Sequence, residues 1–279
     1  MSSLVEGVRV LRAGELAATV DLPASESRAL LAHVLGLPRE RLLAHPDLPV
    51  APEDAARWQR LARDRASGTP MAYLLGEREF LGHRFAVGPG VLVPRPETEI
   101  LVEAALDALR DLPGARVLDL GTGSGCIAIS LALARPDLQI LAVDRSQAAL
   151  GYAQGNALRL GARIALRRSD WYGACAGMRF HLVAANPPYV AGDDPHLAGL
   201  ACEPREALTD GGDGLGALRR VLAGASQHLL PGGAVLVEHG FDQGEAVRAL
   251  ACAYGLGAVR SLRDLAGIER VCAAQAASI

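Results

Sequence analysis

The sequence of 279 residues contains no lysine, so all 28 of its basic side chains are arginines. They are spread along the chain and offset by 31 acidic residues, which leaves a net charge of −3. Arginine suits bidentate and nucleic-acid contacts, but we interpret its exclusive use here as compositional bias. A protein that binds DNA or RNA directly normally has a basic stripe, and none is visible here. We therefore expect no direct nucleic-acid partner.

Other absences narrow the class of protein further. No apolar run approaches the ~18–20 residues of a membrane span, and the first six residues lack the basic head and apolar stretch of a secretory signal. The five cysteines are scattered without a CxxC pair, and the seven histidines show no metal-ligand spacing. These features predict a cytoplasmic protein with reduced thiols, no metal and no membrane segment. In the absence of a strong exposed apolar stripe, we expect a monomer.

The most informative motif is Asn186-Pro187-Pro188-Tyr189, which follows an apolar run at 182–185. We predict a buried strand that ends in a rigid turn. The two prolines fix φ and remove two backbone donors, so the side-chain oxygen of Asn186 and the carbonyl of Pro187 point outward as acceptors. Tyr189 offers an aromatic face beside them. This turn favours a planar NH2 group as its ligand, although a plain proline-rich loop is the alternative interpretation.

A second motif lies upstream, where an apolar strand at 116–120 runs into Gly121-Thr122-Gly123-Ser124-Gly125 and a helical pattern follows at 126–134. A strand, a glycine turn and a helix in this order are typical of the first part of the cofactor site in a doubly wound sheet, because glycine lets the backbone approach a ligand. The G-x-G-x-G spacing departs from the dinucleotide pattern. Asp119 adds a carboxylate at the mouth of this turn, which suits an ammonium group better than a pyrophosphate.

Two further strands bring polar side chains to the same edge of the predicted sheet. The strand at 139–143 ends in Asp144, which lies 144 − 121 = 23 residues after Gly121, near the spacing at which an acid binds ribose hydroxyls. The strand at 163–167 leads to Asp170 and Trp171, which are placed to flank an adenine ring. Each acid alone is as readily a helix cap or a loop residue. Their order along the chain favours a ligand site, because the carboxyl ends of parallel strands meet at one edge.

The chain divides into three predicted segments. Residues 1–70 show helical stretches at 5–18, 25–35, 39–43 and 52–66, with Ser25 as the expected cap of the second, and predict a helical bundle. Residues 71–96 are predicted to form a connector, with hairpin strands at 85–87 and 91–93 around a Gly-Pro-Gly turn. Helix and strand alternate over 97–279, and within it the stretch 209–216 is either a mobile loop near the site or a helix lead-in.

Taken together, these motifs give the chain a resemblance to the S-adenosylmethionine-dependent methyltransferases. Within that group it is most similar to the family of glutamine methyltransferases that modify the Gly-Gly-Gln loop of peptide chain release factors. Further stretches that carry the resemblance are GTPMAYLLG at 68–76 with Glu79-Phe80, VPRPETE at 93–99, EPREAL at 203–208 and EHG at 238–240. The chain departs from the family pattern at His181, where an aspartate is usual, and at Cys202, where an aromatic residue is usual.

The resemblance implies an α/β fold: a doubly wound, seven-stranded class I methyltransferase sheet with a small N-terminal helical bundle joined by a β-hairpin. It implies S-adenosylmethionine as cofactor and release factors as protein partners in translation termination. The bundle would grip the substrate protein or, alternatively, act as a stabilising appendage. The predicted cofactor-binding residues are Asp119, Gly121, Thr122, Gly123, Ser124, Gly125, Asp144, Asp170, Trp171 and Asn186. The predicted substrate-binding residues are Asn186, Pro187, Pro188 and Tyr189, of which Asn186, Pro187 and Tyr189 are also predicted to be catalytic.

The predicted mechanism has to overcome the weak nucleophilicity of a carboxamide nitrogen. The acceptors of Asn186 and Pro187 would orient that nitrogen and stabilise its developing positive charge. Glu238 and His239 are candidate bases that we expect to be structural instead, and for Tyr189 stacking on the substrate and packing in the core are equally open. Rival functions are a glutamine methyltransferase acting on a ribosomal protein, an adenine-N6 methyltransferase acting on nucleic acid, and a binding module without catalysis.

Overall fold

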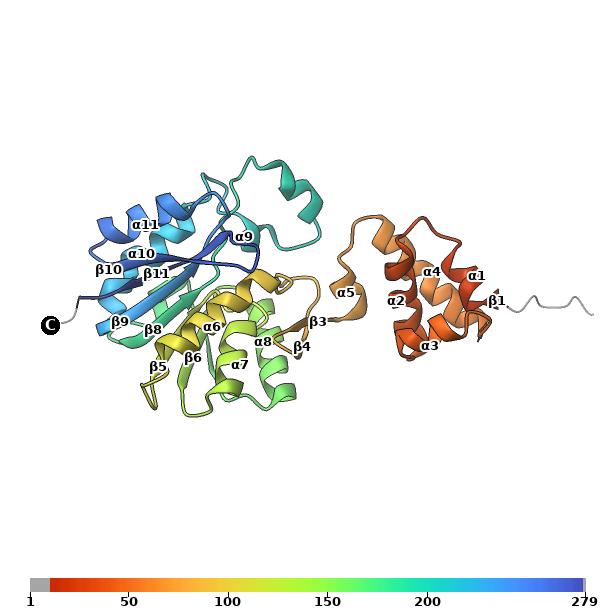
Figure 1. Ribbon diagram of the computed structural model, residues 1–279, viewed down its shortest axis with the longest axis horizontal. Coiled ribbons are helices and arrows are strands. Elements are labelled where there is room, and N and C mark those ends of the chain that lie inside the picture. Colours follow the sequence, from red (N-terminus) through yellow and green to blue (C-terminus); the bar gives the residue numbers. More distant parts are fainter. Residues whose placement is uncertain (1–10, 278–279) are drawn as a thin grey trace, which may run out of the picture. The chain divides into compact units, whose positions relative to one another are not determined.

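The computed structural model describes residues 11–277, which form two compact units (Figure 1). The first unit ends at Gly76 and the second begins at Glu77, so the residues predicted as a connector are divided between them. Each unit has its own buried apolar core. No helix within residues 11–277 combines the length and apolar character that crossing a lipid bilayer requires.

The first unit is a helical bundle, as its sequence pattern predicts. Its core surrounds Trp58, which is fully buried and donates from Nε1 to the carbonyl oxygen of Ser27 at 3.1 Å. Glu26 accepts two hydrogen bonds from the guanidinium of Arg65, at 2.7 and 3.0 Å, and so joins two helices. The helices are α1 (Ala13–Ala17), α2 (Ala24–Leu35), α3 (Arg39–Ala44), α4 (Pro52–Ala66) and α5 (Met71–Leu75).

Two sequence-based expectations for this unit are wrong. It contains a short antiparallel ladder between β1 (Leu11–Arg12) and β2 (Pro49–Val50), where the first predicted helix covered residues 11–12. Residues 5–10 of that prediction lie outside the described part of the chain. Ser25 does not cap α2, because the helix already begins at Ala24. The preceding Pro23 presets a helix-compatible φ, and its carbonyl accepts from the N–H groups of Glu26 and Ser27 in the first turn of the helix.

The second unit is built on a seven-stranded sheet with the order β10-β11-β9-β8-β5-β6-β7. Strands β5 to β9 are parallel to one another, whereas β11 runs antiparallel to β9 and β10. The chain leaves β5 toward β6 and β7 and then returns to β8 on the other side, so a crevice opens between β5 and β8 at their carboxyl ends. This confirms the predicted doubly wound sheet. The strands are β5 (Arg116–Leu120), β6 (Gln139–Asp144), β7 (Ala165–Arg168), β8 (Phe180–Ala185), β9 (Leu229–Glu238), β10 (Gly257–Arg263) and β11 (Glu269–Gln275).

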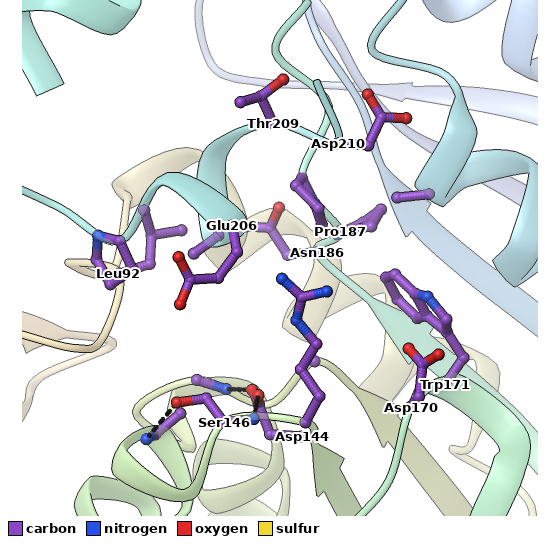
Figure 2. A pocket seen from close by; sticks show the side chains of 18 of the residues that line it. Leu92, Asp144, Ser146, Asp170, Trp171, Asn186, Pro187, Glu206, Thr209 and Asp210 are labelled. Carbon is purple, nitrogen blue, oxygen red and sulfur yellow. Dashed lines mark hydrogen bonds between the residues drawn. The ribbon is translucent and has the colours of Figure 1, made fainter. Parts of the chain in front are cut away.

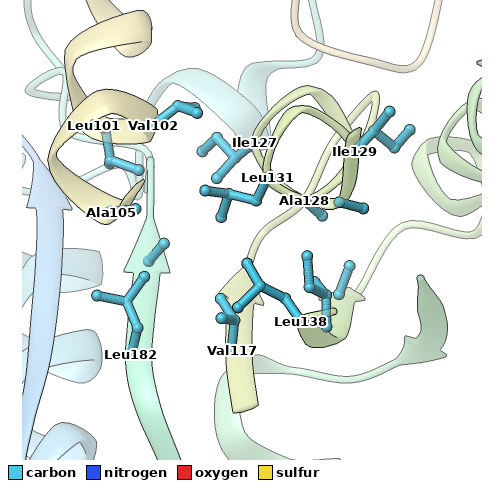
Figure 3. Close-up of a cluster of buried hydrophobic side chains, with 14 of the residues drawn as sticks. Leu101, Val102, Ala105, Val117, Ile127, Ala128, Ile129, Leu131, Leu138 and Leu182 are labelled. Carbon is cyan, nitrogen blue, oxygen red and sulfur yellow. The ribbon is translucent and has the colours of Figure 1, made fainter. Parts of the chain in front are cut away.

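Helices cover both faces of this sheet. Figure 3 shows Leu101 and Ala105 on one helix and Leu131 on the next, facing Val117 and Leu182 of the sheet. Seven of the nine residues in α7 are buried, which explains why this helix is apolar on almost every side. A helix held so firmly also fixes the glycine turn from which it starts. The helices on this face are α6 (Glu99–Ala108), α7 (Cys126–Ala134) and α8 (Gln147–Leu160), and those on the other are α10 (Gly216–His228) and α11 (Gly244–Ala253).

The β-hairpin lies earlier in the chain than predicted. It joins β3 (Glu77–Phe80) to β4 (His83–Ala86) through the two-residue turn Leu81-Gly82, both with positive φ (47° and 74°). Such a turn usually begins with Asn, Asp or Gly, so a leucine at this position does not predict a hairpin turn. The Gly-Pro-Gly sequence downstream is typical of a turn, although no hairpin forms there. Residues 91–93 form no strand. Val91 and Leu92 instead contribute to the cavity at the carboxyl edge of the sheet.

Candidate active site

A cavity of about 390 Å³ opens at the carboxyl edge of the second unit's sheet (Figure 2). The ends of four neighbouring parallel strands contribute residues to it, as the motifs predict. The lining includes Gly121 and Gly123 after β5, Asp144 at the end of β6, Asp170 and Trp171 after β7, and Asn186, Pro187 and Pro188 after β8. The structure therefore gathers into one place side chains that are up to 188 − 121 = 67 residues apart.

The glycine turn holds its backbone open toward the cavity. Gly121 has a φ of +72°, and its N–H and that of Thr122 donate to the carbonyl oxygen of Val143 at 2.9 and 3.0 Å. A Cβ added at Gly121 would meet no atom within 4 Å. The space beside this backbone is thus free for a ligand to approach closely.

Asp119 lies beneath the turn rather than at its mouth. Its side chain is fully buried, and Oδ2 accepts a hydrogen bond from the hydroxyl of Thr122 at 2.6 Å. Burial raises the pKa of the carboxyl to about 7, the Thr122 bond opposing the shift. Ser124 and Gly125 also lie behind the turn, where the Ser124 carbonyl accepts from the buried Asn156 amide at 2.9 Å. These residues support the turn from below, and the expectation that Asp119 faces a ligand does not agree with its position.

Asp144 connects the glycine turn to the start of α8. Its Oδ2 accepts from the N–H of Gly123 at 2.9 Å and its Oδ1 from the N–H of Ser146 at 2.8 Å (Figure 2). Ser146 in turn caps α8, accepting from the N–H of Ala149 at 3.2 Å. A carboxylate has about four acceptor positions, so Asp144 retains capacity for ligand hydroxyls at the cavity wall. Burial raises its pKa.

Asp170 and Trp171 lie next to each other at one side of the cavity (Figure 2). Trp171 has a positive φ of 48°, which is rare for a bulky side chain. The hydroxyl of Ser169 stabilises this backbone by donating to the Trp171 carbonyl at 2.8 Å. Asp170 is exposed and lies 3.8 Å from the guanidinium of Arg220. The strained backbone places the indole along the cavity, as expected for a residue that flanks a ring.

The acceptor of the Asn-Pro-Pro-Tyr turn has a defined orientation. The amide nitrogen of Asn186 donates to the hydroxyl oxygen of Thr98 at 3.0 Å. Thr98 is buried at the end of the 3-10 turn η1 (Pro96–Thr98). Since the NH2 end of Asn186 is committed to Thr98, its Oδ1 is the end that remains for a ligand.

Tyr189 points away from the cavity. Its hydroxyl donates to Oε1 of Glu238 at 3.2 Å, and its ring packs against the core that α10 and α11 cover. Burial raises the pKa of the phenol, so Tyr189 stays protonated. Of the two roles left open by the sequence, its position agrees with packing in the core.

The cavity has further walls that the sequence analysis did not identify as site residues. They come from residues 90–92 and from α9 (Arg205–Leu208), where Glu206 extends into the cavity (Figure 2). Glu203, just before α9, links that helix to the segment that follows residues 90–92. Its carboxylate accepts from the N–H of Val93 at 2.9 Å and from the guanidinium of Arg95 at 2.5 Å. Thr209 and Asp210 also line the cavity, which confirms that the glycine-rich loop lies near the site. In the sequence, the segments around Arg95 and Glu203 stand out only through their resemblance to the methyltransferase family.

The chain is similar to known proteins over most of its length. Residues 10–76 match the PrmC N-terminal domain and residues 96–215 the methyltransferase small domain. The release factor glutamine methyltransferase of Bordetella pertussis is 55% identical over 260 residues, which are 92% of this chain and 96% of that protein. The chain belongs to the release factor glutamine methyltransferase family. The family member from Burkholderia pseudomallei is 50% identical over 92% of this chain and 94% of its own.

A solved structure extends the comparison to the fold alone. The T. thermophilus 16S rRNA N2 G1207 methyltransferase, in complex with AdoMet and guanosine, is 20% identical with a TM-score of 0.54. The match covers 72% of this chain and 49% of that one. At this identity the match shows a shared fold over that part of the two chains.

Neither departure from the family pattern disturbs the cavity. His181 lies at the start of β8, where its Nδ1 accepts the N–H of Arg116 at 2.9 Å. The imidazole therefore supplies an acceptor at a position where the family usually has an aspartate. Cys202 is exposed and precedes the buried Glu203.

Proposed function

We propose that this enzyme transfers a methyl group from S-adenosylmethionine to the side-chain amide nitrogen (N5) of a glutamine, that of the Gly-Gly-Gln motif in peptide chain release factors. The observation that carries the proposal is the orientation of Asn186 at the cavity wall. Its NH2 group is held by Thr98 at 3.0 Å, so its oxygen is available to a substrate NH2. Membership of the family supports the choice of glutamine and of release factors.

The residues at the cavity fit the cofactor. We assign the ribose hydroxyls to Asp144, which keeps free acceptor positions, and the adenine to the side formed by Asp170 and Trp171. The amino-acid end belongs at Gly121, where the absence of a Cβ leaves the backbone accessible. When bound, S-adenosylmethionine supplies an electrophilic methyl group. Asp119, Thr122, Ser124 and Gly125 contribute indirectly, by holding the glycine turn.

Catalysis rests on two oxygen acceptors. The lone pair of a carboxamide nitrogen is delocalised into its carbonyl, so the nitrogen must be oriented and its positive charge stabilised as the new bond forms. Asn186 Oδ1 and the Pro187 carbonyl accept its two N–H groups, and the prolines keep this corner rigid. A substrate without an NH2 group would cover these two acceptors and leave them without a hydrogen bond, which disfavours its binding.

No strong base is required, because the nitrogen becomes acidic once it is alkylated and its proton can leave to solvent. Glu238 is 1% exposed and is not among the residues that line the cavity. His239 is buried as well, its Nδ1 lies 2.8 Å from the Gly240 carbonyl, and burial lowers its pKa. Both residues therefore support the structure of this region rather than accept the substrate proton.

The first unit is proposed to bind the release factor. A protein substrate needs contact area beyond the reacting side chain, and a bundle with its own core can present such a surface. We further propose that the enzyme works as a monomer in the cytoplasm, in translation termination and without direct contact to nucleic acid. The net charge of −3 without a basic stripe supports the last point.

A labelled-methyl assay tests the function. The enzyme is incubated with labelled S-adenosylmethionine and one of three acceptors: release factor, ribosomal protein or DNA. Mass spectrometry then locates the label. We expect it on the glutamine N5 of the release factor and not on a release factor whose Gly-Gly-Gln glutamine is changed to glutamate. Label on only the ribosomal protein or adenine would select a rival function, and a bound cofactor with its sulfonium turned away from Asn186 would refute the mechanism.

A further inference from the structure

Glu238 is a buried carboxylate beside the methyl-acceptor turn. It ends β9, and because Ala185 pairs with Val237 in the parallel ladder, Glu238 is the next residue across from Asn186. Its Oε1 accepts from the Tyr189 hydroxyl at 3.2 Å, whereas its Oε2 is buried without a hydrogen-bond partner among the described residues. A half-satisfied buried carboxyl is costly, so its presence here needs a functional reason.

Thr98 connects this carboxylate to Asn186. The oxygen of the Thr98 hydroxyl accepts from Asn186 Nδ2, so the hydroxyl proton is directed to another acceptor. Of the groups that lower the pKa of the Glu238 carboxyl, the Thr98 hydroxyl has the largest effect, which places Glu238 as the acceptor for that proton. This arrangement permits donation in one direction, from Asn186 to Thr98 and from Thr98 toward Glu238, whose Oε1 also accepts from the Tyr189 hydroxyl on the other side.

We propose that Glu238 is the positioning residue of the methyl-acceptor turn: as a carboxylate it receives the hydroxyl protons of Thr98 and Tyr189, and so keeps Asn186 Oδ1 facing the substrate. This inference rests on the proposed function. A Glu238 protonated on the oxygen that faces Thr98 would donate to Thr98 instead. The Thr98 proton would then point at Asn186, whose amide would have to turn its oxygen inward and present NH2 to the NH2 of the substrate, donor against donor.

The surroundings of Glu238 set the pH at which this change occurs. The pKa of its carboxyl is raised to about 7, chiefly by burial and to a smaller degree by the charge of Glu97. Arg270 on β11 and the Tyr189 hydroxyl lower it, though less than burial raises it. Two further titratable neighbours are Cys126 on α7, whose burial raises its pKa to about 12 and keeps the thiol neutral, and the adjacent His239, whose pKa burial lowers. The acceptor orientation is thus favoured as the pH rises through about 7.

The side-chain amide of Asn186 reports on this switch without any ligand. We suggest recording its 15N-labelled NH2 resonances between about pH 5.5 and 8.5, with Asn186→Ala for assignment. We expect the resonances to titrate with a midpoint near 7 in the wild-type protein and to stay constant in Glu238→Gln. Resonances that do not titrate, or that titrate equally in Glu238→Gln, would overturn the proposal. Because no substrate is present, this result is independent of the methylation assay.

Kinetics provide the second readout. We expect wild-type kcat to fall as the pH drops below about 7. In Glu238→Gln this acid limb should be lost and kcat at high pH reduced by about fivefold or more, with the Kd for cofactor and the KM for release factor changed less than about twofold. In Tyr189→Phe the midpoint should move to higher pH, because a bond that lowers the carboxyl pKa is removed; this variant replaces Glu238→Gln if the latter does not fold. Wild-type kcat and pH profile in both variants would show that Glu238 merely fills space.

Discussion

The amide nitrogen of Asn186 lies 3.0 Å from the hydroxyl oxygen of Thr98, although 88 positions separate them in the sequence. The bond joins the end of β8 to the 3-10 turn that leads into α6. It gives a physical role to the PRPETE segment, which supplies the partner that orients the acceptor at the cavity wall. Thr98 thus contributes to the site without being among the residues that line the cavity.

Replacing Thr98 tests this bond directly. Thr98→Val keeps the shape of the side chain but removes the hydroxyl, and should lower kcat by about tenfold, as expected for one lost hydrogen bond of ~1–2 kcal/mol. Thr98→Ser is the matched control, since it keeps the hydroxyl, and should retain most of the activity. Both are measured as kcat with whole release factor at saturating cofactor. Equal rates in the valine and serine variants would show that the bond does not orient Asn186.

Loss of the acceptor itself should be more severe. Asn186→Ala is expected to remove ~2–4 kcal/mol of transition-state stabilisation, the range for one preorganised polar group. Turnover should fall far more than cofactor affinity, because Asp144 and the glycine turn remain intact. Single-turnover rates and calorimetric cofactor titrations separate the two effects. Near-normal turnover would contradict the acceptor mechanism.

Gly121 and Gly161 form a matched pair for the cofactor site. Both have a φ of +72°, and at neither would a Cβ meet an atom within 4 Å. Alanine at either position should therefore cost about the same in backbone strain, roughly 1 kcal/mol of stability. Of these two glycines, Gly121 lines the cavity and Gly161 does not. We therefore expect Gly121→Ala to weaken cofactor binding by about tenfold or more and Gly161→Ala to leave cofactor binding unchanged. Similar Kd values for the two variants would argue against cofactor contact with the turn.

Asp119 should make stability depend on pH. Its folded-state pKa is raised from 3.8 to about 7, so the folded protein holds the proton more tightly, and the stability gained from protonation is lost as the pH rises through this window. At about 1.4 kcal/mol per pKa unit, the loss is at most ~4 kcal/mol. The Asp119→Asn variant cannot lose stability in this way, because its amide does not titrate. As the pH rises from about 4 to 8, we expect the denaturant midpoint of the variant to increase relative to that of the wild type. A difference between the two midpoints that does not change with pH would contradict the raised pKa of Asp119.

The parts of this site that could be predicted from sequence are those with a local signal. The glycine turn, Asp144 and Asn186 each follow a short apolar strand, and the carboxyl ends of parallel strands meet at one edge. The predicted position of the hairpin is wrong because its turn starts at Leu81, and leucine rarely adopts a positive φ. The hairpin is also held by a contact distant in sequence: the Asn156 side chain accepts from the N–H of Ala86 at 2.7 Å and donates to its carbonyl at 3.0 Å.

The orientations of side chains could not be predicted in this way. Asp119 and Tyr189 both belong to recognisable motifs, yet one lies beneath the turn and the other points into the core. Which way each side chain points depends on partners distant in sequence, such as Glu238, 49 positions after Tyr189. Motif spacing identifies the edge of the sheet at which residues gather, whereas three-dimensional packing decides which of them face the ligand.

The division between the two units makes the role of the first one testable. Removing residues 1–76 leaves the second unit, which has its own core and contains every residue that lines the cavity. If the first unit binds the release factor, the KM for whole release factor should rise by about tenfold or more, while the Kd for cofactor stays within about twofold. A short Gly-Gly-Gln peptide is the matched control, because it is too small to use a second contact surface. The truncated and full-length enzymes should methylate it at similar rates. Unchanged methylation of whole release factor by the truncated enzyme, with both proteins shown to be folded by circular dichroism, would make the bundle a stabilising appendage.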